Sequence, residues 1–262
     1  MKNILGIALF AALMLSCGGT VVPELINGTG KIAHSEFDIS ATYTELHVSR
    51  GIKVVLVEPG NGRGTITAGE AVIEHVSIVE NDGVVRVTYA PNKARIRPKT
   101  GAVVTMPLSG NLRKIDVSSA GRVVCDNVIR AHNMHIDLSS AAHVDLSIQG
   151  DELDVEMSSA ANALLSVNCT RIGVDLSSAA KCTIRGVVSE LGVDAGSAAR
   201  FRGFELASSH AKLESSSGGN VEAAVGKTLD VDVSSGALIR YKGSPQIMNQ
   251  RVSSGGSLRS VQ

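Results

Sequence analysis

The chain has 262 residues, and its 25 Lys and Arg residues are balanced by 25 Asp and Glu residues, so it carries no net formal charge. Nucleic-acid-binding proteins usually present a basic face, and this balance argues against nucleic acid as a partner. Aromatic residues make up 3% of the chain and Trp is missing, which weighs against aromatic sugar clefts and base-stacking surfaces.

Residues 1–17 have the pattern of a lipoprotein-type signal peptide. A short basic start is followed by the apolar run 4–15, and a small residue precedes Cys17. The run is shorter than a typical membrane span. We expect lipidation of Cys17, which would anchor the chain to a membrane; the alternative is an ordinary cleaved signal with a chance Cys. The Gly-rich residues 18–30 are expected to form a flexible tether.

Residues 31–110 are expected to form a β-rich part. Apolar runs predict strands at 52–57, 74–79, 84–89 and 102–106. The turn sequence Glu80–Gly83 favours a hairpin between the second and third of these strands. Because a bare end of stacked strands exposes a sheet edge, we expect this part to be continuous with residues 111–262 and to cover their first coil. Its basic residues alternate as on one exposed strand face and predict no basic cluster: Lys93, Arg95, Arg97 and Lys99.

A short phrase recurs through residues 111–262. Its clearest copies are Asp137-Leu-Ser-Ser-Ala-Ala and Asp175-Leu-Ser-Ser-Ala-Ala. The first serine position of the eight copies falls at residues 118, 139, 158, 177, 196, 216, 234 and 253, with Gly at 196. The steps between copies are 21, 19, 19, 19, 20, 18 and 19 residues, and this regularity indicates stacked repeats.

A period near 19 residues is too short for a pair of helices and suits one coil of a β-solenoid. Apolar and polar residues alternate within each unit, as in 152–158, which is the pattern of half-buried strands. We predict an all-β protein: a right-handed parallel β-helix of about 19-residue coils. The small residues after the serines should form tight corners, Gln149–Asp151 a second turn, and the stacked serines a hydrogen-bonded column.

Several stretches resemble one known family: Phe37–Ile39, Ser49–Glu58, 71–89, Val103–Pro107 and Leu112–Gly121. They are similar to the family named "putative auto-transporter adhesin, head GIN domain", over roughly residues 33–260. The resemblance implies a β-helix-like fold and a cell-envelope location, because members are secreted or lipid-anchored proteins common in Bacteroidetes. It carries no catalytic motif.

Seven acidic residues occupy equivalent outward positions, one per coil: Asp116, Asp137, Glu156, Asp175, Asp194, Glu214 and Asp232. Neighbouring coils lie ~4.8 Å apart, and like charges directly opposite each other are destabilising. We expect a solvated outer face; the alternative is a shallow cation-binding stripe with Asp137, Glu156 and Asp175 as candidate ligands. We expect His132, His135 and His143 to be exposed rather than metal-bound. The cysteines Cys125, Cys169 and Cys182 lie at different offsets in their coils and are expected to be free, buried thiols.

No nucleophile, base and acid set is recognisable, and no cofactor is expected. Ser178 and Lys181 have the spacing of serine acyl enzymes, but both are copies of repeat positions, and that chemistry needs a helix start. We predict a non-enzymatic cell-envelope lipoprotein, on the periplasmic or surface face, that serves as an adhesin or as a scaffold for a protein or glycan. The alternatives are a polysaccharide lyase or hydrolase, and a structural protein that forms a homo-oligomer through its open C-terminal end.

Overall fold

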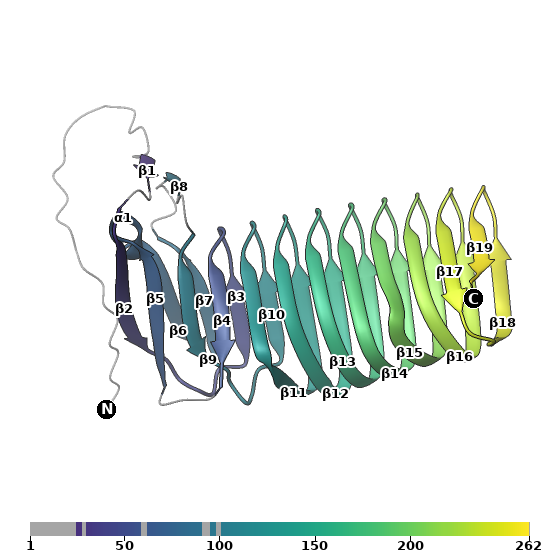
Figure 1. Cartoon of the computed structure of the whole chain (residues 1–262), viewed down its shortest axis with the longest axis horizontal. Helices are drawn as coiled ribbons and strands as arrows, with labels where there is room; N and C mark the ends of the chain where they lie inside the picture. The colour runs from purple at the N-terminus through teal and green to yellow at the C-terminus, as the bar shows by residue number, and fades with distance from the viewer. Residues whose placement is uncertain (1–24, 28–29, 59–61, 91–94, 98–100, 262) are drawn as a thin grey trace.

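The computed structural model describes residues 25–27, 30–58, 62–90, 95–97 and 101–261. These residues form β-strands almost throughout, and the strands stack along one long axis (Figure 1). The one helix in these ranges, α1 (Glu70–Ile73), has four residues, and no helical segment there has the length and hydrophobicity of a membrane span. The predicted all-β architecture is confirmed.

The repeat forms a regular solenoid in which each rung pairs in parallel with the rungs before and after it. Ile136, Val155 and Val174 lie opposite one another on successive rungs and point into the core. The register advances by 19 residues at both steps, which confirms the predicted period. The strands are β10 (Lys114–Val117), β11 (Arg122–Leu138), β12 (His143–Met157), β13 (Asn162–Leu176), β14 (Lys181–Ala195), β15 (Arg200–Ser215), β16 (Asn220–Val233), β17 (Leu238–Lys242), β18 (Gln246–Val252) and β19 (Ser257–Ser260).

Each full rung is one long strand that bends, so the turn predicted at Gln149–Asp151 is wrong. Gln149 and Gly150 remain in the ladder, opposite Asn168 and Cys169. The bend therefore keeps its backbone hydrogen bonds to the neighbouring rung instead of leaving them to solvent. Gly150 is required there, because a Cβ atom on it would lie 1.8 Å from the carbonyl oxygen of Ala131.

The other corner of each coil is a tight turn formed by the serine phrase, as predicted. In one copy, Ser159 and Ala160 have φ angles of 53° and 61°, and the amide of Ala161 donates to the carbonyl oxygen of Ser158 at 3.1 Å. Two successive positive φ angles with this bond describe a type I′ turn. The amide of Ala160 also donates to the carbonyl oxygen of Ser178 at 2.9 Å, so the ladder continues through the corners. This bond offsets the cost, about 1–2 kcal/mol per residue, of a left-handed backbone at residues other than glycine.

A ninth corner, which the repeat pattern did not predict, lies at residues 49–52. Arg50 and Gly51 have φ angles of 60° and 74°. The amide of Gly51 donates to the carbonyl oxygen of Ser119 at 2.9 Å. The amide of Ala120 donates in the same way to the carbonyl oxygen of Ser140 in the following corner. The solenoid therefore begins before residue 111.

The serines stack in register, but their hydroxyl groups do not form the predicted column of hydrogen bonds. The amides of Ser139 and Ser158 donate to the carbonyl oxygens of Val117 and Leu138, which holds one serine per coil in line. Rungs ~4.8 Å apart leave equivalent hydroxyls beyond hydrogen-bonding distance. Within the described ranges, no hydrogen bond joins two hydroxyls of this column.

The N-terminal part continues the solenoid and covers its first coil, as predicted. β3 (Glu45–Val48) and β4 (Lys53–Val57) pair in parallel with β10 and β11. β7 (Val84–Tyr89) and β9 (Val103–Pro107) form the next layer. Antiparallel strands close this end (Figure 1): β2 (Ile32–Asp38), β5 (Arg63–Gly69) and β6 (Val76–Asn81). The predicted hairpin is confirmed, since β6 and β7 pair across its turn.

Two expectations fall wholly or partly outside the described residues. Cys17 and the signal segment 1–17 lie outside, as do the side chains of the basic run 93–99. Within the segment expected to be a tether, β1 (Leu25–Asn27) pairs in parallel with β8 (Arg95–Arg97).

The last rung carries features that blunt an open sheet edge. β18 is exposed along its whole length. Its register slips by one residue at Met248, and the inward position that holds Val231 on the preceding rung holds Gln250. Bulges and inward polar residues discourage pairing of an edge with another chain. They therefore speak against a second copy stacking on this end, and the homo-oligomer stays a prediction.

Candidate functional site

The predicted acidic residues form one continuous column on the outside of the solenoid. Each lies directly opposite the next on the neighbouring rung, and all are at least partly exposed. The acidic column consists of Asp116, Asp137, Glu156, Asp175, Asp194, Glu214 and Asp232. It lies where each strand enters the serine corner, as the alternation predicted.

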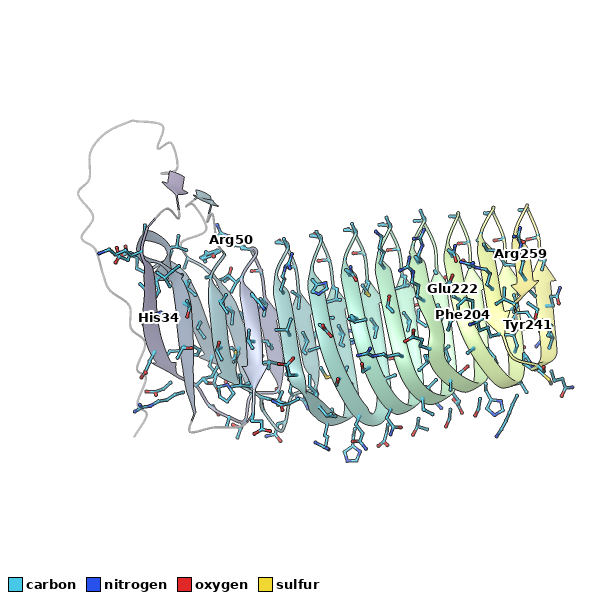
Figure 2. All side chains as sticks on the ribbon, in the orientation of Figure 1. His34, Arg50, Phe204, Glu222, Tyr241 and Arg259 are labelled. Carbon is cyan, nitrogen blue, oxygen red and sulfur yellow. The ribbon has the colours of Figure 1, made fainter. Side chains whose placement is uncertain are left out.

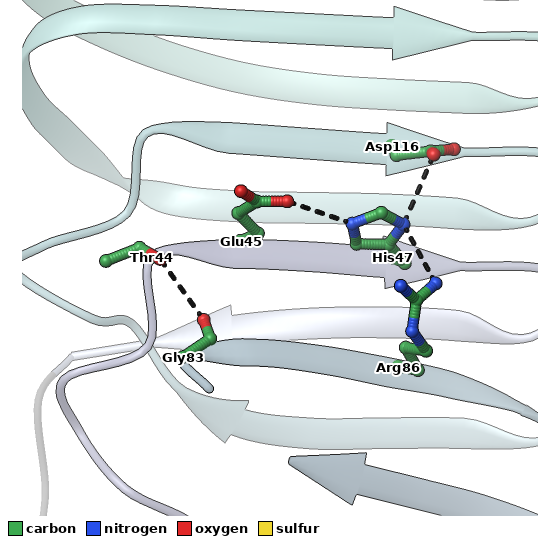
Figure 3. A network of polar contacts seen from close by, with 6 residues as sticks. All are labelled: Thr44, Glu45, His47, Gly83, Arg86 and Asp116. Atoms are coloured by element: carbon green, nitrogen blue, oxygen red, sulfur yellow. Dashed lines mark hydrogen bonds and ion pairs between the residues drawn. The ribbon is translucent and has the colours of Figure 1, made fainter. Parts of the chain in front are cut away.

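Residues from other parts of the chain contact both ends of the acidic column. At the N-terminal end, Nδ1 of His47 lies 3.2 Å from a carboxylate oxygen of Asp116 (Figure 3). Glu45 and Arg86 also contact the His47 ring, at 3.2 and 3.5 Å. At the C-terminal end, Arg251 lies 3.2 Å from Asp232.

The middle of the acidic column is left without basic partners. Asp137, Glu156, Asp175 and Asp194 make no ion pair within the described residues, whereas the next member, Glu214, pairs with Lys212 at 2.6 Å. These four carboxylates line a shallow groove of about 620 Å³ together with Ser158, Ser177 and Ser216. Solvent reaches the whole groove, so hydration limits the repulsion between them.

Burial and neighbouring charges raise the pKa of the Asp194 carboxyl group. Partial desolvation is the larger cause, and the carboxylates of Glu214 and Asp175 on the adjacent rungs add to it. A carboxyl group whose pKa is raised on folding binds its proton more tightly in the folded state. The ionised Asp194 therefore destabilises the fold at neutral pH, and this cost is lost as the pH falls through the raised pKa.

Replacing Asp194 with Asn should stabilise the protein at pH 7 by about 0.5 kcal/mol, because it removes two opposed like-charge contacts. The gain should shrink as the pH falls and the wild-type carboxyl group takes up its proton. Thermal unfolding followed by circular dichroism at pH 7 and pH 4 would measure both effects. Asp232→Asn is the matched control: it breaks the pair with Arg251 and should not stabilise. An unchanged or lower melting temperature for Asp194→Asn at pH 7 would contradict this account.

The candidate cation ligands Asp137, Glu156 and Asp175 lie on successive rungs of a flat strand surface. In the described part of the chain, no three His, Cys, Asp or Glu side chains gather closely enough to hold a metal ion. A strong Ca²⁺ site needs six or more converging oxygen atoms, which parallel rungs do not supply. His132 is exposed and contacts Asp151 at 2.7 Å, while His135 and His143 are partly exposed on other strand positions.

The three cysteines in the described part of the chain offer no reactive thiol. Cys125, Cys169 and Cys182 are free and buried, which confirms the prediction. Burial raises the pKa of all three thiols, for Cys182 to about 12. A nucleophilic cysteine needs the opposite shift, toward the thiolate at neutral pH.

A second charged column, of opposite sign, follows the corner on the other sheet. We call it the basic column: Lys53, Arg122, His143, Asn162, Lys181, Arg200 and Asn220, which lie opposite one another on successive rungs. Arg202 flanks it, two residues beyond Arg200. Four of its seven members are Lys or Arg, and the other three are His143, Asn162 and Asn220. Its members lie far apart in the sequence. Each one from Arg122 to Asn220 directly follows the two small residues at the end of a serine phrase, and this shared position identifies the column.

The family model "Putative auto-transporter adhesin, head GIN domain" matches residues 42–245. Two similar crystal structures are of putative adhesins. The one from Parabacteroides distasonis ATCC 8503 has 19% identity and a TM-score of 0.84, covering 91% of this chain and 100% of that chain. The one from Parabacteroides merdae ATCC 43184 has 17% identity and a TM-score of 0.83, covering 91% and 99%.

A third similar structure is named a putative lipid binding protein, also from Parabacteroides distasonis ATCC 8503, with 17% identity and a TM-score of 0.78; it covers 91% of this chain and 100% of that chain. At these identities the likeness shows a common fold. A comparison with curated proteins gives no match. Because the family model spans most of the solenoid, the chain belongs to the auto-transporter adhesin head GIN domain family.

Proposed function

We propose that the protein is a non-enzymatic, lipid-anchored protein of the cell envelope that binds its partner along the side of a rigid solenoid. The observation that carries this proposal is the evenness of the coils, which follow one another at steps of 18 to 21 residues. No coil of the repeat has room for a long inserted loop. Each outward residue is thus one of a row repeated along the axis, and such rows suit the binding of an extended partner.

The same evenness disfavours the polysaccharide lyase or hydrolase. Enzymes need groups that converge on a reacting atom, in a pocket that excludes water. The grooves here are shallow, and their carboxylates lie in straight rows. Membership of a family named for adhesins and the signal-like residues 1–17 support export to the envelope. Self-assembly through the C-terminal end has less support, because the last rung is blunted by Met248 and Gln250.

The anchor is tested by replacing Cys17 with Ser in the full chain. The wild-type protein should fractionate with membranes, since several acyl chains on one residue hold a protein firmly in a leaflet. The Cys17→Ser variant should move largely to the soluble fraction. Cys125→Ser is the matched control, because it removes a buried thiol far from the signal and should leave fractionation unchanged. If Cys17→Ser stays with the membranes, the lipid anchor is refuted.

A further inference from the structure

We propose that the basic column binds a linear acidic polysaccharide lying along the axis of the solenoid. The inference rests on the proposed function and deepens it, because it names the binding face and the chemical class of the ligand. Lys181, Arg200 and Arg202 are the residues assigned the largest contribution.

These three cations are crowded together without an acidic partner. Lys181 lies directly opposite Arg200, and Arg202 lies opposite Thr183, two residues further along both strands. All three are exposed, and none makes an ion pair within the described ranges. Like charges placed directly opposite each other on neighbouring strands are destabilising. The fold itself gains nothing from this arrangement, whereas a bound anion would relieve the repulsion.

Several outward cations on the other sheet form ion pairs with carboxylates. On the other sheet, Arg171 contacts Glu152 and Glu190 at 3.1 and 3.0 Å, and Lys212 contacts Glu214 at 2.6 Å. Arg251 of the last rung also has an acidic partner. The repeat can therefore pair an outward cation with a carboxylate on the same or a neighbouring rung, and in the described part of the structure Lys181, Arg200 and Arg202 have no such pair.

The carboxylate that lies opposite Arg202 is already engaged. Glu222 lies opposite Arg202 on the next rung, but it forms its ion pair with Arg240 on the far side. Glu222 lies among the last rungs of the solenoid (Figure 2). Arg202 therefore keeps its donors available to a ligand.

The rest of the basic column extends the same face toward the N-terminal end. Lys53 lies opposite Arg122, and Arg122 opposite His143. Burial and the positive charge of Arg122 both lower the pKa of His143, so its ring is neutral at pH 7. The column thus offers two cationic stretches, at Lys53 with Arg122 and at Lys181 with Arg200. Between them His143 and the exposed Asn162 can make neutral hydrogen bonds.

A row of hydroxyl groups runs beside the basic column. The second serine of each corner precedes a column residue by three positions and is exposed: Ser119, Ser140, Ser159, Ser178 and Ser197. Pairs of cationic residues separated by a pair of neutral hydrogen-bonding residues, one residue per rung of ~4.8 Å, suit a chain of sugar rings that carries both hydroxyl and carboxylate groups.

Three other anionic partners fit this face less well. Duplex DNA is wide, and the acidic column across the corner would repel its outer phosphates within a Debye length of about 10 Å. Single-stranded nucleic acid lacks the row of stacking aromatic rings it needs. An anionic membrane is flat and would meet Asp145 and Glu205, which are exposed on the same sheet. A narrow polysaccharide can follow the cations alone.

The test compares two triple variants of the full chain. The first, Lys181→Gln/Arg200→Gln/Arg202→Gln, removes the cluster. The control, Arg171→Gln/Lys212→Gln/Arg251→Gln, removes the same charge from the other sheet. Binding to polygalacturonate is measured by calorimetry at low and at physiological salt, with neutral dextran, duplex DNA and phosphatidylglycerol vesicles as competitors. Circular dichroism melting checks that both variants fold.

We expect the wild type to bind polygalacturonate and not dextran, with an affinity that falls as salt rises. The cluster variant should lose about tenfold or more in affinity, which corresponds to about three lost charged contacts, and the control should change about twofold or less. Equal losses in both variants, or stronger binding to DNA or to vesicles than to polygalacturonate, would overturn the proposal. Cleavage of the polymer would instead refute the non-enzymatic function and leave the binding site standing.

Discussion

Gly186→Ala should destabilise the protein by about 3 kcal/mol or more, one of the largest effects expected from any single methyl group in this chain. Gly186 lies in β14, where the rung bends, and its φ of 123° is a conformation that other residues rarely adopt. A Cβ atom on it would lie 1.9 Å from the carbonyl oxygen of Val167 on the preceding rung. The substitution therefore either strains the backbone or breaks the ladder at the bend. Urea unfolding would measure the loss.

The control is Gly192→Ala, in the same strand. Gly192 has no positive φ, and its Cβ atom would lie 3.8 Å from the carbonyl oxygen of Ile172, an ordinary contact. Alanine restricts the unfolded chain and should stabilise the strand by about 0.5–1 kcal/mol. The two variants carry the same substitution at different positions of one strand. A loss of stability at Gly186 and a gain at Gly192 would therefore assign the loss to the bend. Equal losses at both glycines would show that the bend has no special need for glycine.

The period and the alternation were enough to predict the regular part of the fold. Apolar residues recur at the same offset in each repeat, so Val155 must stack on Ile136 and under Val174 in any parallel solenoid. Outward positions follow by the same logic, which is why the acidic column was predictable residue by residue. Both predictions depend only on local alternation and a constant step.

The bends and the first corner were not predictable in this way. A bend that keeps its backbone hydrogen bonds to the next rung has no sequence pattern that distinguishes it from a turn. The prediction of a turn at Gln149–Asp151 is wrong for that reason. The corner at Arg50 and Gly51 has only Ser49 in common with the serine phrase. Strands β5, β6, β7 and β9 lie between it and the next corner, at Ser118. An insertion of that length breaks the period on which detection of the repeat depends.

The charge partners were also beyond the sequence pattern. The ends of the acidic column are contacted by His47 and Arg251, which belong to the N-terminal part and to the last rung. The basic column does not appear as a run of Lys and Arg in the sequence, because Lys53, Arg122 and Lys181 come from different coils. Charge clusters that form across rungs become visible only when the sequence is aligned on its own period.

Phe201→Ala should cost about 3–5 kcal/mol, the range found when a fully buried aromatic ring is removed. Phe201 is completely buried in β15, between Cys182 and Val221 on the adjacent rungs. Small neighbours make room for it, since a Cβ atom on Gly203 would lie 2.5 Å from the ring. Rungs stabilise only their neighbours, so the loss should lower the urea midpoint and speed hydrogen exchange in β14 and β16 first.

Phe204 provides the control, because it is a ring of the same size at a half-buried position three residues away (Figure 2). The ammonium of Lys242 lies 4.8 Å from the centre of its ring, and Phe204→Ala should cost about 1 kcal/mol. A cost for Phe201→Ala no larger than this would mean that the rung collapses to fill the space.

The pairing of Phe201 with Gly203 can be tested directly by a double substitution. Gly203→Ala alone should destabilise, because its methyl group meets the Phe201 ring and, at 3.0 Å, the carbonyl oxygen of Glu222. In the Phe201→Ala background the ring is gone, and the same methyl group should partly fill the space that it leaves. The cost of the double variant should therefore be about 1 kcal/mol or more below the sum of the single costs. Additive costs would mean that the glycine serves the backbone of the next rung and not the ring.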